Sequence, residues 1–348
     1  MGKLHVEDRV AVPPDTASKL AQGLFEAAGA GPDVAAEVAG HLIEADQCGV
    51  ESHGFVRTIQ YMREMLDGTV IPTARPIVNR LSDTVLMINA QGGIGIPAMR
   101  RTHELAVEQA QQTGLAAVGL LGAGHTGRLG AFGDIAANRH CLSITLGGGN
   151  RKTWRMVAPY GGREAMLPTN PFCIAMPGGD LGPVIIDIAT SQAAGGWIYA
   201  PRAAGVSLPE GLILDRHGAP SCDPQDYFDG GAILPKGGPL GYGMALIAEL
   251  IGEAMLGPVE KGEINWLVLA VDCRSFNQAH AMQRVAEEIL SEIRASAPQR
   301  EAEPVQIPGE RERALHAASQ GQPLMVPRKI WETIMTLAQD HGVEVPDL

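Results

Sequence analysis

Helical sequence patterns lie at both ends of this chain, and apolar runs of strand length alternate with helical patterns between them. Residues 15–28, 32–49 and 52–68 are each predicted to form a helix, because each run begins near Pro, Asp or Ser and stops at a glycine. Residues 328–340 carry a similar pattern. With 348 residues, the chain is long enough for two domains or one large one, of the α/β or α+β class.

The middle of the chain supplies the predicted sheet and the helices that connect its strands. The predicted strands are residues 84–89, 115–121, 141–146, 172–176, 184–188 and 265–271, and residues 213–219 are predicted to form a hairpin. The predicted helices are residues 97–113, 128–139, 242–256 and 278–297, with another starting near Gln192.

Charge and cysteine usage exclude several functional classes. The net charge of −12 makes a nucleic-acid partner improbable. The five cysteines show no CxxC spacing and are odd in number, which argues against a disulfide framework and favours a reduced, cytoplasmic setting. No signal peptide is expected, the apolar residues 242–256 are too few to span a membrane, and no Cys/His cluster suggests a metal.

The glycine-rich motif Gly122-Ala123-Gly124-His125-Thr126-Gly127 follows a predicted strand and precedes a predicted helix. This is the setting of a Rossmann dinucleotide-binding turn. However, no acidic residue for the ribose hydroxyls ends the next predicted strand. Three interpretations therefore stay open, namely a Rossmann turn, a structural strand-to-helix turn and a phosphate-binding loop of another fold.

A polar stripe is predicted on the helix over residues 52–68. His53, Arg57 and Tyr61 are four residues apart and would share one face. A small 2-oxo acid needs a cation for its carboxylate and a proton donor for its carbonyl oxygen, and this trio offers both. A second stripe is predicted to face the core, and it consists of Val56, Ile59, Met62 and Leu66.

Seven sequence blocks, in order along the chain, resemble the malate/L-lactate/sulfolactate dehydrogenase family, whose cofactor fold is not a Rossmann fold. The blocks are Ser52-His53-Gly54 with Arg57, Tyr61 and Gly68; Gly124-His125-Thr126-Gly127; Pro159-Tyr160-Gly161-Gly162; Thr169-Asn170-Pro171; Asp187-Ile188-Ala189-Thr190-Ser191; Gly237-Gly238 with Gly241-Tyr242-Gly243; and Pro308-Gly309-Glu310. The resemblance implies a discontinuous helical domain, residues 1–72 and 309–348, and a central NAD(P)-binding α/β domain, residues 73–308. It also implies a homodimer.

The same resemblance implies roles for individual residues. His53 is expected to be the acid/base, with Ser52 as its partner or as a helix cap, and Arg57 is expected to hold the substrate carboxylate. His125 competes with His53 for the proton-transfer role. The residues expected to contact NAD or NADP are His125, Thr126, Gly127, Arg128, Leu129, Thr169, Asn170, Asp187, Ile188, Ala189, Gly309, Glu310 and Arg311.

Three positions depart from the family pattern. Leu240 replaces a lysine that commonly contacts the cofactor, Trp197 replaces an Asp or Lys, and residues 147–154 replace a shorter cofactor segment. The leading hypothesis is an NAD(P)-dependent oxidoreductase for 2-oxo or 2-hydroxy acids or related cyclic imines. The alternatives are a ligand-binding relative without dehydrogenase activity and an ordinary Rossmann dehydrogenase.

Overall fold

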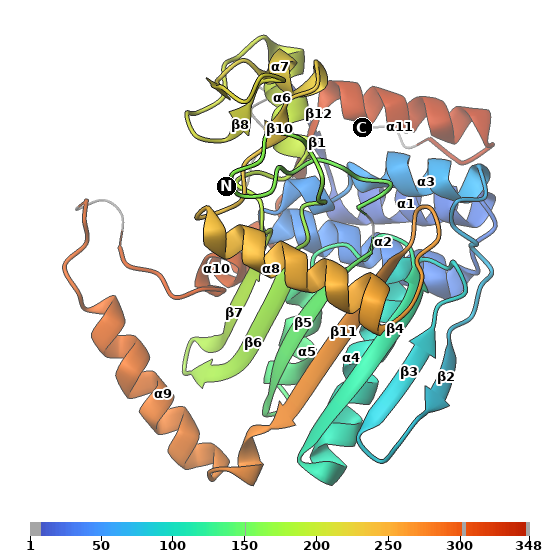
Figure 1. Ribbon diagram of the computed structural model, residues 1–348. Helices are drawn as coiled ribbons and strands as arrows, with labels where there is room; N and C mark the ends of the chain where they lie inside the picture. Colours follow the sequence, from blue (N-terminus) through green and yellow to red (C-terminus); the bar gives the residue numbers. More distant parts are fainter. Residues whose placement is uncertain (1–7, 150, 301–303, 346–348) are drawn as a thin grey trace.

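A computed structural model of the chain describes residues 8–149, 151–300 and 304–345, so expectations for residues 1–7 and for Asn150 lie outside it. At its centre is a seven-stranded mixed sheet in the order β2-β3-β4-β11-β5-β6-β7 (Figure 1). Its strands are β2 (Ile77–Arg80), β3 (Val85–Asn89), β4 (Leu115–Ala123), β11 (Ile264–Asp272), β5 (Cys141–Gly148), β6 (Phe172–Gly179) and β7 (Gly182–Ile188).

The pairing of these strands rules out a doubly wound parallel sheet. Only β3 and β4 pair in parallel, and every other neighbouring pair in this sheet is antiparallel. Strand β11 lies between β4 and β5, which flank the glycine-rich motif and the helix after it. The Rossmann interpretation of residues 122–127 is therefore wrong, and the predicted non-Rossmann α/β class is confirmed.

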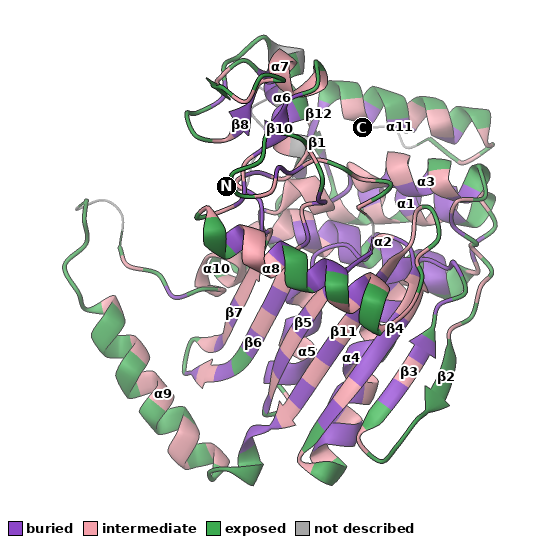
Figure 2. Cartoon of the chain, in the orientation of Figure 1, coloured by how far each residue is buried: buried purple, intermediate pink, exposed green. Residues whose placement is uncertain are grey.

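Helices cover both faces of the sheet (Figures 1 and 2). Helices α4 and α5 lie behind the sheet in the view of Figure 1, and α8 crosses in front of it. The longer helices are α1 (Pro14–Ala27), α2 (Pro32–Gln47), α3 (Arg57–Leu66), α4 (Gly95–Thr113), α5 (Gly130–Ala137), α6 (Gly196–Ala204), α8 (Pro239–Glu249), α9 (Ala279–Arg294), α10 (Glu310–Ser319) and α11 (Arg328–Asp340).

One hydrophobic cluster joins the sheet to the helices from both chain ends. Val118 and Val268 of the sheet belong to it together with Leu42 of α2 and Ile334 of α11. Fully buried side chains of this kind each stabilise the fold by roughly 1.5–3 kcal/mol. The core thus continues from the central sheet into the amino- and carboxyl-terminal helices.

The two ends of the described chain meet in a small sheet of their own. Strand β1 (Arg9–Val12) pairs antiparallel with β12 (Leu324–Pro327), which leads directly into α11. Helix α11 also contacts α1 and α3. This arrangement agrees with a helical part built from both ends, while the division at residues 72 and 309 stays a prediction.

A second, smaller cluster lies at the top of the view in Figure 1. It is formed around Ile198, Ile213 and Ile233, with Trp197 packed against its edge. The elements around it are α6, α7 (Pro224–Phe228), β8 (Ile213–Leu214), β9 (Pro220–Ser221) and β10 (Ala232–Ile233). Strands β8 and β9 pair, which confirms the hairpin predicted over residues 213–219.

The structure differs from the sequence predictions where helices begin and end. The predicted helix over residues 52–68 is a 3₁₀ turn, Glu51–His53, followed by α3. The predicted helix over residues 242–256 consists of α8 and then a π-helical turn, Leu250–Met255. Strand β2 was not predicted, because all four of its residues are exposed and show no buried alternation. No described helix has the length and apolarity needed to cross a bilayer.

Candidate active site

The segment before α3 is shaped by a buried carboxylate. Asp46 of α2 accepts a hydrogen bond from the Phe55 N–H at 2.7 Å. A Cβ atom on Gly54 would lie 2.2 Å from the Asp46 carboxylate, so only glycine fits here. Burial raises the pKa of Asp46 to about 7. The turn that carries Ser52 and His53 is therefore held on top of α2.

Ser52 does not cap α3, as one of its predicted roles required. Helix α3 begins at Arg57 and has no side-chain cap, and the Ser52 hydroxyl lies 3.0 Å from Nδ1 of His53. This contact agrees with the predicted pairing of the two residues. The Ser52 carbonyl also accepts a hydrogen bond from Nε of Arg57 at 2.6 Å, which holds the guanidinium against the same turn.

Tyr61 and His125 are joined across the site. The Tyr61 hydroxyl lies 2.6 Å from Nδ1 of His125, and the Gly127 N–H donates to the same nitrogen at 3.2 Å. Because Nδ1 accepts from a backbone N–H, the hydrogen of the neutral imidazole is on Nε2. Tyr61 then donates its O–H. Tyr61 of the predicted polar stripe is thus both buried and hydrogen-bonded.

The rings of His53 and His125 stack, with centroids 5.5 Å apart and planes 26° apart. Burial lowers the pKa of His53 to about 3, and the positive charge of Arg57 contributes to the shift. The same two causes lower the pKa of His125 well below its ordinary value. Burial is therefore the main cause of both shifts. Both imidazoles are neutral at physiological pH.

Arg57 carries a partly buried charge that no described carboxylate contacts directly. Its Nε donates to Ser52 and its Nη1 to the side-chain oxygen of Gln60, and within the described ranges no acidic group lies within 4.0 Å of it. Burial lowers the pKa of the guanidinium. A partly buried guanidinium in this state can donate charge-assisted hydrogen bonds to a carboxylate from outside the protein.

A small pocket opens beside these groups, with a volume of about 10 Å³, which is room for about one water molecule. Tyr61 and His125 provide its polar atoms together with Glu64, and the rest of its wall is mostly apolar. Its lining residues are Tyr61, Glu64, Met65, Val70, Ile94, Gly95 and His125. Helix α4 approaches closely at Gly95, where a Cβ atom would lie 2.1 Å from the Gly124 carbonyl oxygen.

Sequence reasoning missed Gln60 and Glu64, although a signal for them was available. Gln60 accepts from Arg57 and donates to Glu64 Oε1 at 2.7 Å. The two lie three and seven residues after Arg57, on the same helical face. The predicted core stripe was also partly wrong, because Leu66 is half exposed while Thr58, Tyr61, Met62 and Met65 are buried.

The loop predicted to contact the cofactor, residues 125–129, and Gly130 after it use backbone N–H groups for hydrogen bonds inside the protein. The Arg128 N–H donates to Nε2 of His41 at 3.0 Å, and the Gly130 N–H donates to the Asp187 carboxylate at 2.7 Å. Asp187 therefore occupies the start of α5, and burial raises its pKa. These N–H groups are not free to hold a phosphate in this arrangement, and the roles of Thr126 and Leu129 stay predictions.

Arg128 is almost completely buried and forms an ion pair with Glu44 of α2 at 2.7 Å. Its Nε atom has no hydrogen-bond partner among the described residues. Arg128 lies near Asp187 of β7 and binds Glu44 of α2, so it connects the central sheet to the amino-terminal helices.

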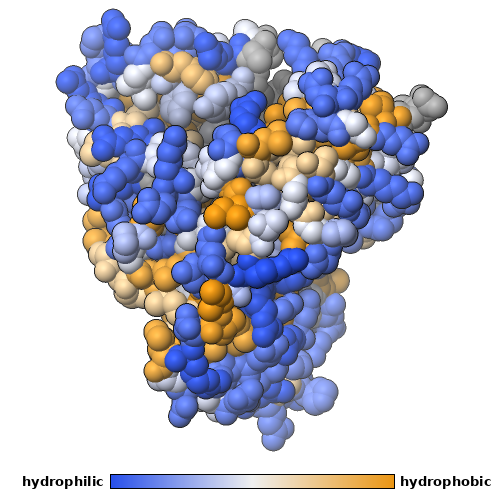
Figure 3. Space-filling view, turned by 90° about the vertical axis from the view of Figure 1, so that its right-hand side faces the viewer, coloured by the Kyte–Doolittle hydropathy of each residue, from blue (hydrophilic) through white to orange (hydrophobic). Residues whose placement is uncertain are grey.

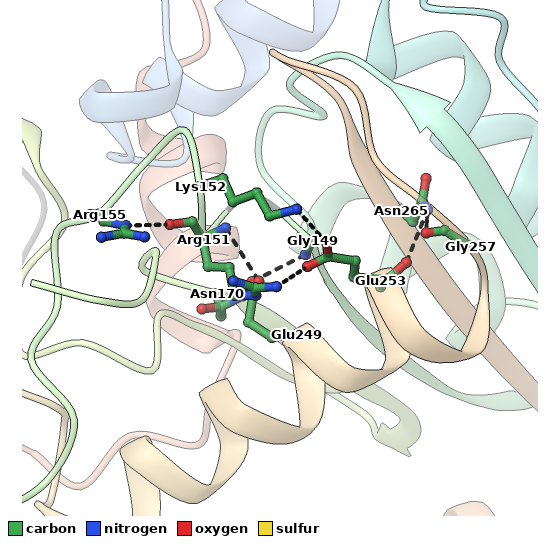
Figure 4. Close-up of polar contacts among 10 residues, drawn as sticks. Gly149, Arg151, Lys152, Arg155, Asn170, Glu249, Glu253, Gly257 and Asn265 are labelled. Atoms are coloured by element: carbon green, nitrogen blue, oxygen red, sulfur yellow. Dashed lines mark hydrogen bonds and ion pairs between the residues drawn. The ribbon is translucent and has the colours of Figure 1, made fainter.

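Asn170 belongs to a buried network around Glu249 (Figure 4). Glu249 Oε1 accepts from Asn170 Nδ2 at 2.7 Å and from the Gly149 N–H at 3.1 Å, and Oε2 accepts from the Arg151 N–H at 3.3 Å. Oδ1 of Asn170 is buried with no partner among the described residues. The carboxylate at the end of α8 thus fixes the segment that departs from the family pattern.

Two basic side chains of that segment point to one carboxylate in Figure 4. Arg151 and Lys152 lie 3.0 and 3.3 Å from Glu253 of the π-helical turn. A 2′-phosphate of NADP would have to compete with Glu253 for them, so these two residues do not decide between NAD and NADP.

The remaining predicted cofactor residues are spread over two regions. The Thr169 carbonyl accepts from the Thr190 N–H at 3.0 Å, next to Ile188 and Ala189 at the end of β7. Gly309 precedes α10, where Glu310 binds Arg294 at 2.7 Å and Arg311 binds Glu312. The latter segment therefore has a clear structural role as a helix start, and its cofactor role stays a prediction.

The two unusual large residues occupy different environments. Trp197 is half-buried and packs against the smaller hydrophobic cluster, whereas Leu240 is 71% exposed in the first turn of α8. In the parts of the chain that the structure describes, no group of three His, Cys, Asp or Glu side chains is arranged to hold a metal ion.

Comparison with known proteins gives a consistent result. Residues 12–335 match the family model described as malate/L-lactate dehydrogenase. An L-lactate dehydrogenase of Cupriavidus necator is 32% identical over 95% of this chain and 98% of its own length. A Δ1-pyrroline-2-carboxylate/Δ1-piperideine-2-carboxylate reductase of Pseudomonas putida is 31% identical over 74% of each chain. The malate dehydrogenase structure from Pyrococcus horikoshii superimposes with a TM-score of 0.88 at 26% identity, covering 99% of this chain and all of that one.

Proposed function

The chain belongs to the malate/L-lactate dehydrogenase family of oxidoreductases, and we propose that it transfers a hydride between NAD(P) and a 2-oxo or 2-hydroxy acid or a related cyclic imino acid. In this proposal His53 is the acid/base and Arg57 holds the carboxylate. The observation that carries it is the partly buried Arg57 guanidinium, which has no ion pair among the described residues and lies near two imidazoles whose pKa values are lowered.

Arg57 orients the substrate in this scheme. Two of its nitrogens hold it to Ser52 and Gln60, so the remaining N–H groups present a fixed edge to a carboxylate. A bound carboxylate also neutralises the charge that helps to lower the pKa of His53. Substrate binding should therefore raise the pKa of this imidazole toward the range in which it exchanges protons.

His53 accepts the proton of the substrate hydroxyl during oxidation and returns it during reduction. The Ser52 hydroxyl contacts its Nδ1, which leaves Nε2 for the substrate. His125, held with its hydrogen on Nε2, can donate a hydrogen bond to the same substrate oxygen or imine nitrogen. This division of labour uses both histidines and gives the proton-transfer role to His53.

The buried polar atoms are compatible with a nicotinamide cofactor. The unpartnered Oδ1 of Asn170 is an acceptor of the kind that a carboxamide N–H satisfies. When bound, the nicotinamide ring supplies or takes up the hydride. Thr169, Asn170 and the end of β7 are the residues that we propose to hold it, and NAD and NADP remain equal candidates.

We also propose a homodimer. Helix α8 and its π-helical extension expose Leu240, Leu246, Ile247, Leu250 and Met255. Figure 2 shows exposed residues in green at intervals along α8, between buried and intermediate ones, and no helix or strand of the described residues is drawn in front of it. A second copy of the chain could bury these side chains.

A cytoplasmic location is proposed as well. All five cysteines are unpaired, and four of them are buried. Unpaired cysteines are usual in a reduced compartment.

The function is tested with a panel of 2-oxo acids and cyclic imines, each with NADH and with NADPH. We expect oxidation of at least one cofactor, saturable cofactor binding, and a loss of turnover in a folded His53→Ala variant. If neither cofactor binds or is oxidised, the proposal is wrong.

The competing hypothesis of a binding protein without dehydrogenase activity was motivated by Leu240 and Trp197. Trp197 packs against the smaller hydrophobic cluster, and this contact explains structurally why a large apolar residue stands at this position. Turnover that depends on His53 would exclude this hypothesis.

A further inference from the structure

His41 of α2 is almost completely buried, and one of its ring nitrogens holds the loop that carries His125. Its Nε2 accepts a hydrogen bond from the Arg128 N–H at 3.0 Å. Burial lowers the pKa of His41 to about 3, so the ring is neutral. Because a backbone N–H can only donate, the hydrogen of this imidazole is on Nδ1. The loop lies so close that a Cβ atom on Gly127 would be 2.3 Å from Nε2.

Helix α2 holds residue 128 at a second point. Glu44 lies one helical turn after His41, and its carboxylate is 2.7 Å from the Arg128 guanidinium. One face of α2 therefore binds both the backbone N–H and the side chain of Arg128. A shift of this residue would break a buried hydrogen bond as well as an ion pair.

The ring of His41 is itself held by stacking. Phe132 of α5 stacks on it with centroids 5.1 Å apart and planes 17° apart. His103 of α4 also stacks against Phe132, with centroids 5.6 Å apart. The nitrogens of His103 contact the Met99 carbonyl and the Thr145 hydroxyl. The two buried histidines thus share an aromatic neighbour, and of the two it is His41 that is hydrogen-bonded to the loop.

The loop connects the contact at His41 to His125. The Gly127 N–H, which is next along the chain to the N–H that His41 holds, donates to Nδ1 of His125 at 3.2 Å. The Tyr61 hydroxyl contacts the same nitrogen, but a hydroxyl group can either donate or accept. It is therefore the backbone N–H that requires Nδ1 to be an acceptor and places the hydrogen on Nε2.

Packing alone does not explain a histidine at position 41. Its Nδ1 is buried and has no hydrogen-bond partner among the described residues. A buried N–H group without a partner destabilises a fold, and an apolar side chain of similar size would avoid this loss. The acceptor at Nε2 is what a histidine supplies here and an aliphatic residue does not.

We propose that His41 is a positioning residue for the reaction. By holding the Arg128 N–H, it keeps the Gly127 N–H aimed at Nδ1 of His125. His125 then presents its Nε2–H to the substrate oxygen or imine nitrogen. This inference rests on the proposed function, and it adds a residue that touches neither the substrate nor the cofactor in that scheme.

The kinetic test compares His41→Leu, His41→Gln and the control His103→Leu. Leucine removes the acceptor, whereas glutamine keeps an oxygen about as far from the backbone as Nε2. We expect kcat to fall about 3- to 10-fold in His41→Leu and to recover in His41→Gln. The KM for the acid should stay unchanged, because Arg57 is untouched, and His103→Leu should keep the wild-type kcat.

Three kinetic outcomes would overturn the inference. The first is an equal loss of kcat in His41→Leu and His103→Leu, which would show a general packing effect. The second is an equal loss in His41→Leu and His41→Gln, which would show that the acceptor does not matter. The third is a higher KM for the cofactor with an unchanged kcat, which would show that His41 supports cofactor binding instead.

A nitrogen NMR spectrum of the His125 imidazole tests the same contact without turnover. Its signals are assigned by their absence in His125→Gln and recorded without substrate or cofactor. The wild type and His41→Gln should show the hydrogen on Nε2. His41→Leu should show both tautomers, because Tyr61 alone can either donate or accept. If His41→Leu does not fold, His41→Asn takes its place, since its side-chain oxygen stops one bond short of the position of Nε2.

The NMR result also separates this inference from the proposed reaction. Unchanged His125 signals in the variant without the acceptor would overturn the role of His41, whatever the activity. Changed signals in a protein that oxidises neither cofactor would support the link from His41 to His125 and reject the proposed reaction.

Discussion

The Tyr61 hydroxyl lies 2.6 Å from Nδ1 of His125, and the N–H of Gly127, two residues further along the loop, donates to the same nitrogen at 3.2 Å. Two donors on one nitrogen fix the tautomer of the imidazole before any substrate arrives. Tyr61 of α3 thus controls the hydrogen-bonding state of a histidine that is 64 residues away in sequence.

Removing the Tyr61 hydroxyl should lower activity without unfolding the protein. A Tyr61→Phe variant keeps the ring in the core but loses one hydrogen bond, worth about 0.5–1.5 kcal/mol. We expect kcat to fall about 3- to 10-fold, with little change in KM, because the contact orients His125 rather than the carboxylate. Steady-state kinetics at constant pH measures this. A larger effect on KM than on kcat would contradict the assignment.

Replacing Arg57 should weaken binding of the substrate carboxylate more than it affects the fold. In Arg57→Lys the charge is kept, but the fork that contacts Ser52, Gln60 and the substrate is lost. We expect kcat/KM to fall about 10- to 100-fold, which corresponds to a charge-assisted hydrogen bond of about 1.5–3 kcal/mol. Circular dichroism provides the control for folding. An unchanged kcat/KM would show that the carboxylate binds elsewhere.

The pH dependence of hydroxy-acid oxidation should separate the free enzyme from the substrate complex. The pKa of His53 is lowered to about 3, so the imidazole stays unprotonated, and able to accept a proton, far below its ordinary pKa of 6.5. As pH falls, kcat/KM, which reports the free enzyme, should stay level through 6.5. The value of kcat, which reports the substrate complex, should begin to fall at a higher pH than kcat/KM does. The bound carboxylate neutralises Arg57 and so raises the pKa of His53 in the complex. Coincident profiles with a pKa near 6.5 would contradict a buried base.

Glu249 should stabilise the protein far more than its neighbour Glu253. Glu249 is buried and accepts hydrogen bonds from Gly149, Arg151 and Asn170, so Glu249→Ala leaves several buried donors without partners. We expect a loss of about 3 kcal/mol in the free energy of unfolding. The control Glu253→Ala removes two partly exposed ion pairs and should cost less than about 1 kcal/mol. Urea denaturation of both variants tests the difference, and equal losses would show that the network in Figure 4 has no special role.

The sequence predicted the elements that carry strong local signals. Strands with continuous apolar runs, such as β4 and β5, and helices bounded by Gly or Pro, such as α1 and α11, were located to within a few residues. It did not reveal β2, whose exposed residues show no periodicity, or β1 and β12, whose pairing joins positions more than 300 residues apart. Strand order in the sheet likewise depends on contacts distant in sequence, so the insertion of β11 between β4 and β5 could not be derived from local patterns.

The site was predicted better in its residues than in its geometry. The resemblance pointed to His53, Arg57 and His125, and the structure brings them together. Helical spacing suggested that His53 and Arg57 share one face of a helix. In the structure His53 lies in the 3₁₀ turn before α3 instead. That turn is held in place by the hydrogen bond from the Phe55 N–H to Asp46 and by the close fit of Gly54 against the same carboxylate. The roles of the α5 start and of Asp187 could not be foreseen, because which partner a backbone N–H takes depends on tertiary packing.

Apolar side chains remain exposed along the edge of the sheet that is farthest from the smaller cluster. Ile77, Val78 and Leu81 are all exposed there, and Figure 3, which looks onto the side of the molecule with β2 and β3, shows apolar groups in its lower half. The edge strand has four residues and carries Arg80 at its end. A short, charged edge of this kind discourages pairing with the sheets of other molecules.

The pairing of β1 with β12 has a consequence for how the enzyme can be handled. Arg9 of β1 holds the Glu51 carboxylate through both terminal nitrogens, at 3.0 and 3.1 Å, and Glu51 directly precedes Ser52. Trimming by a protease or a bulky fusion partner at this strand would loosen the tether on the turn that carries the proposed base. A preparation damaged at its amino-terminal strand could therefore remain folded and yet lose turnover, and intact mass should be checked before any activity is judged absent.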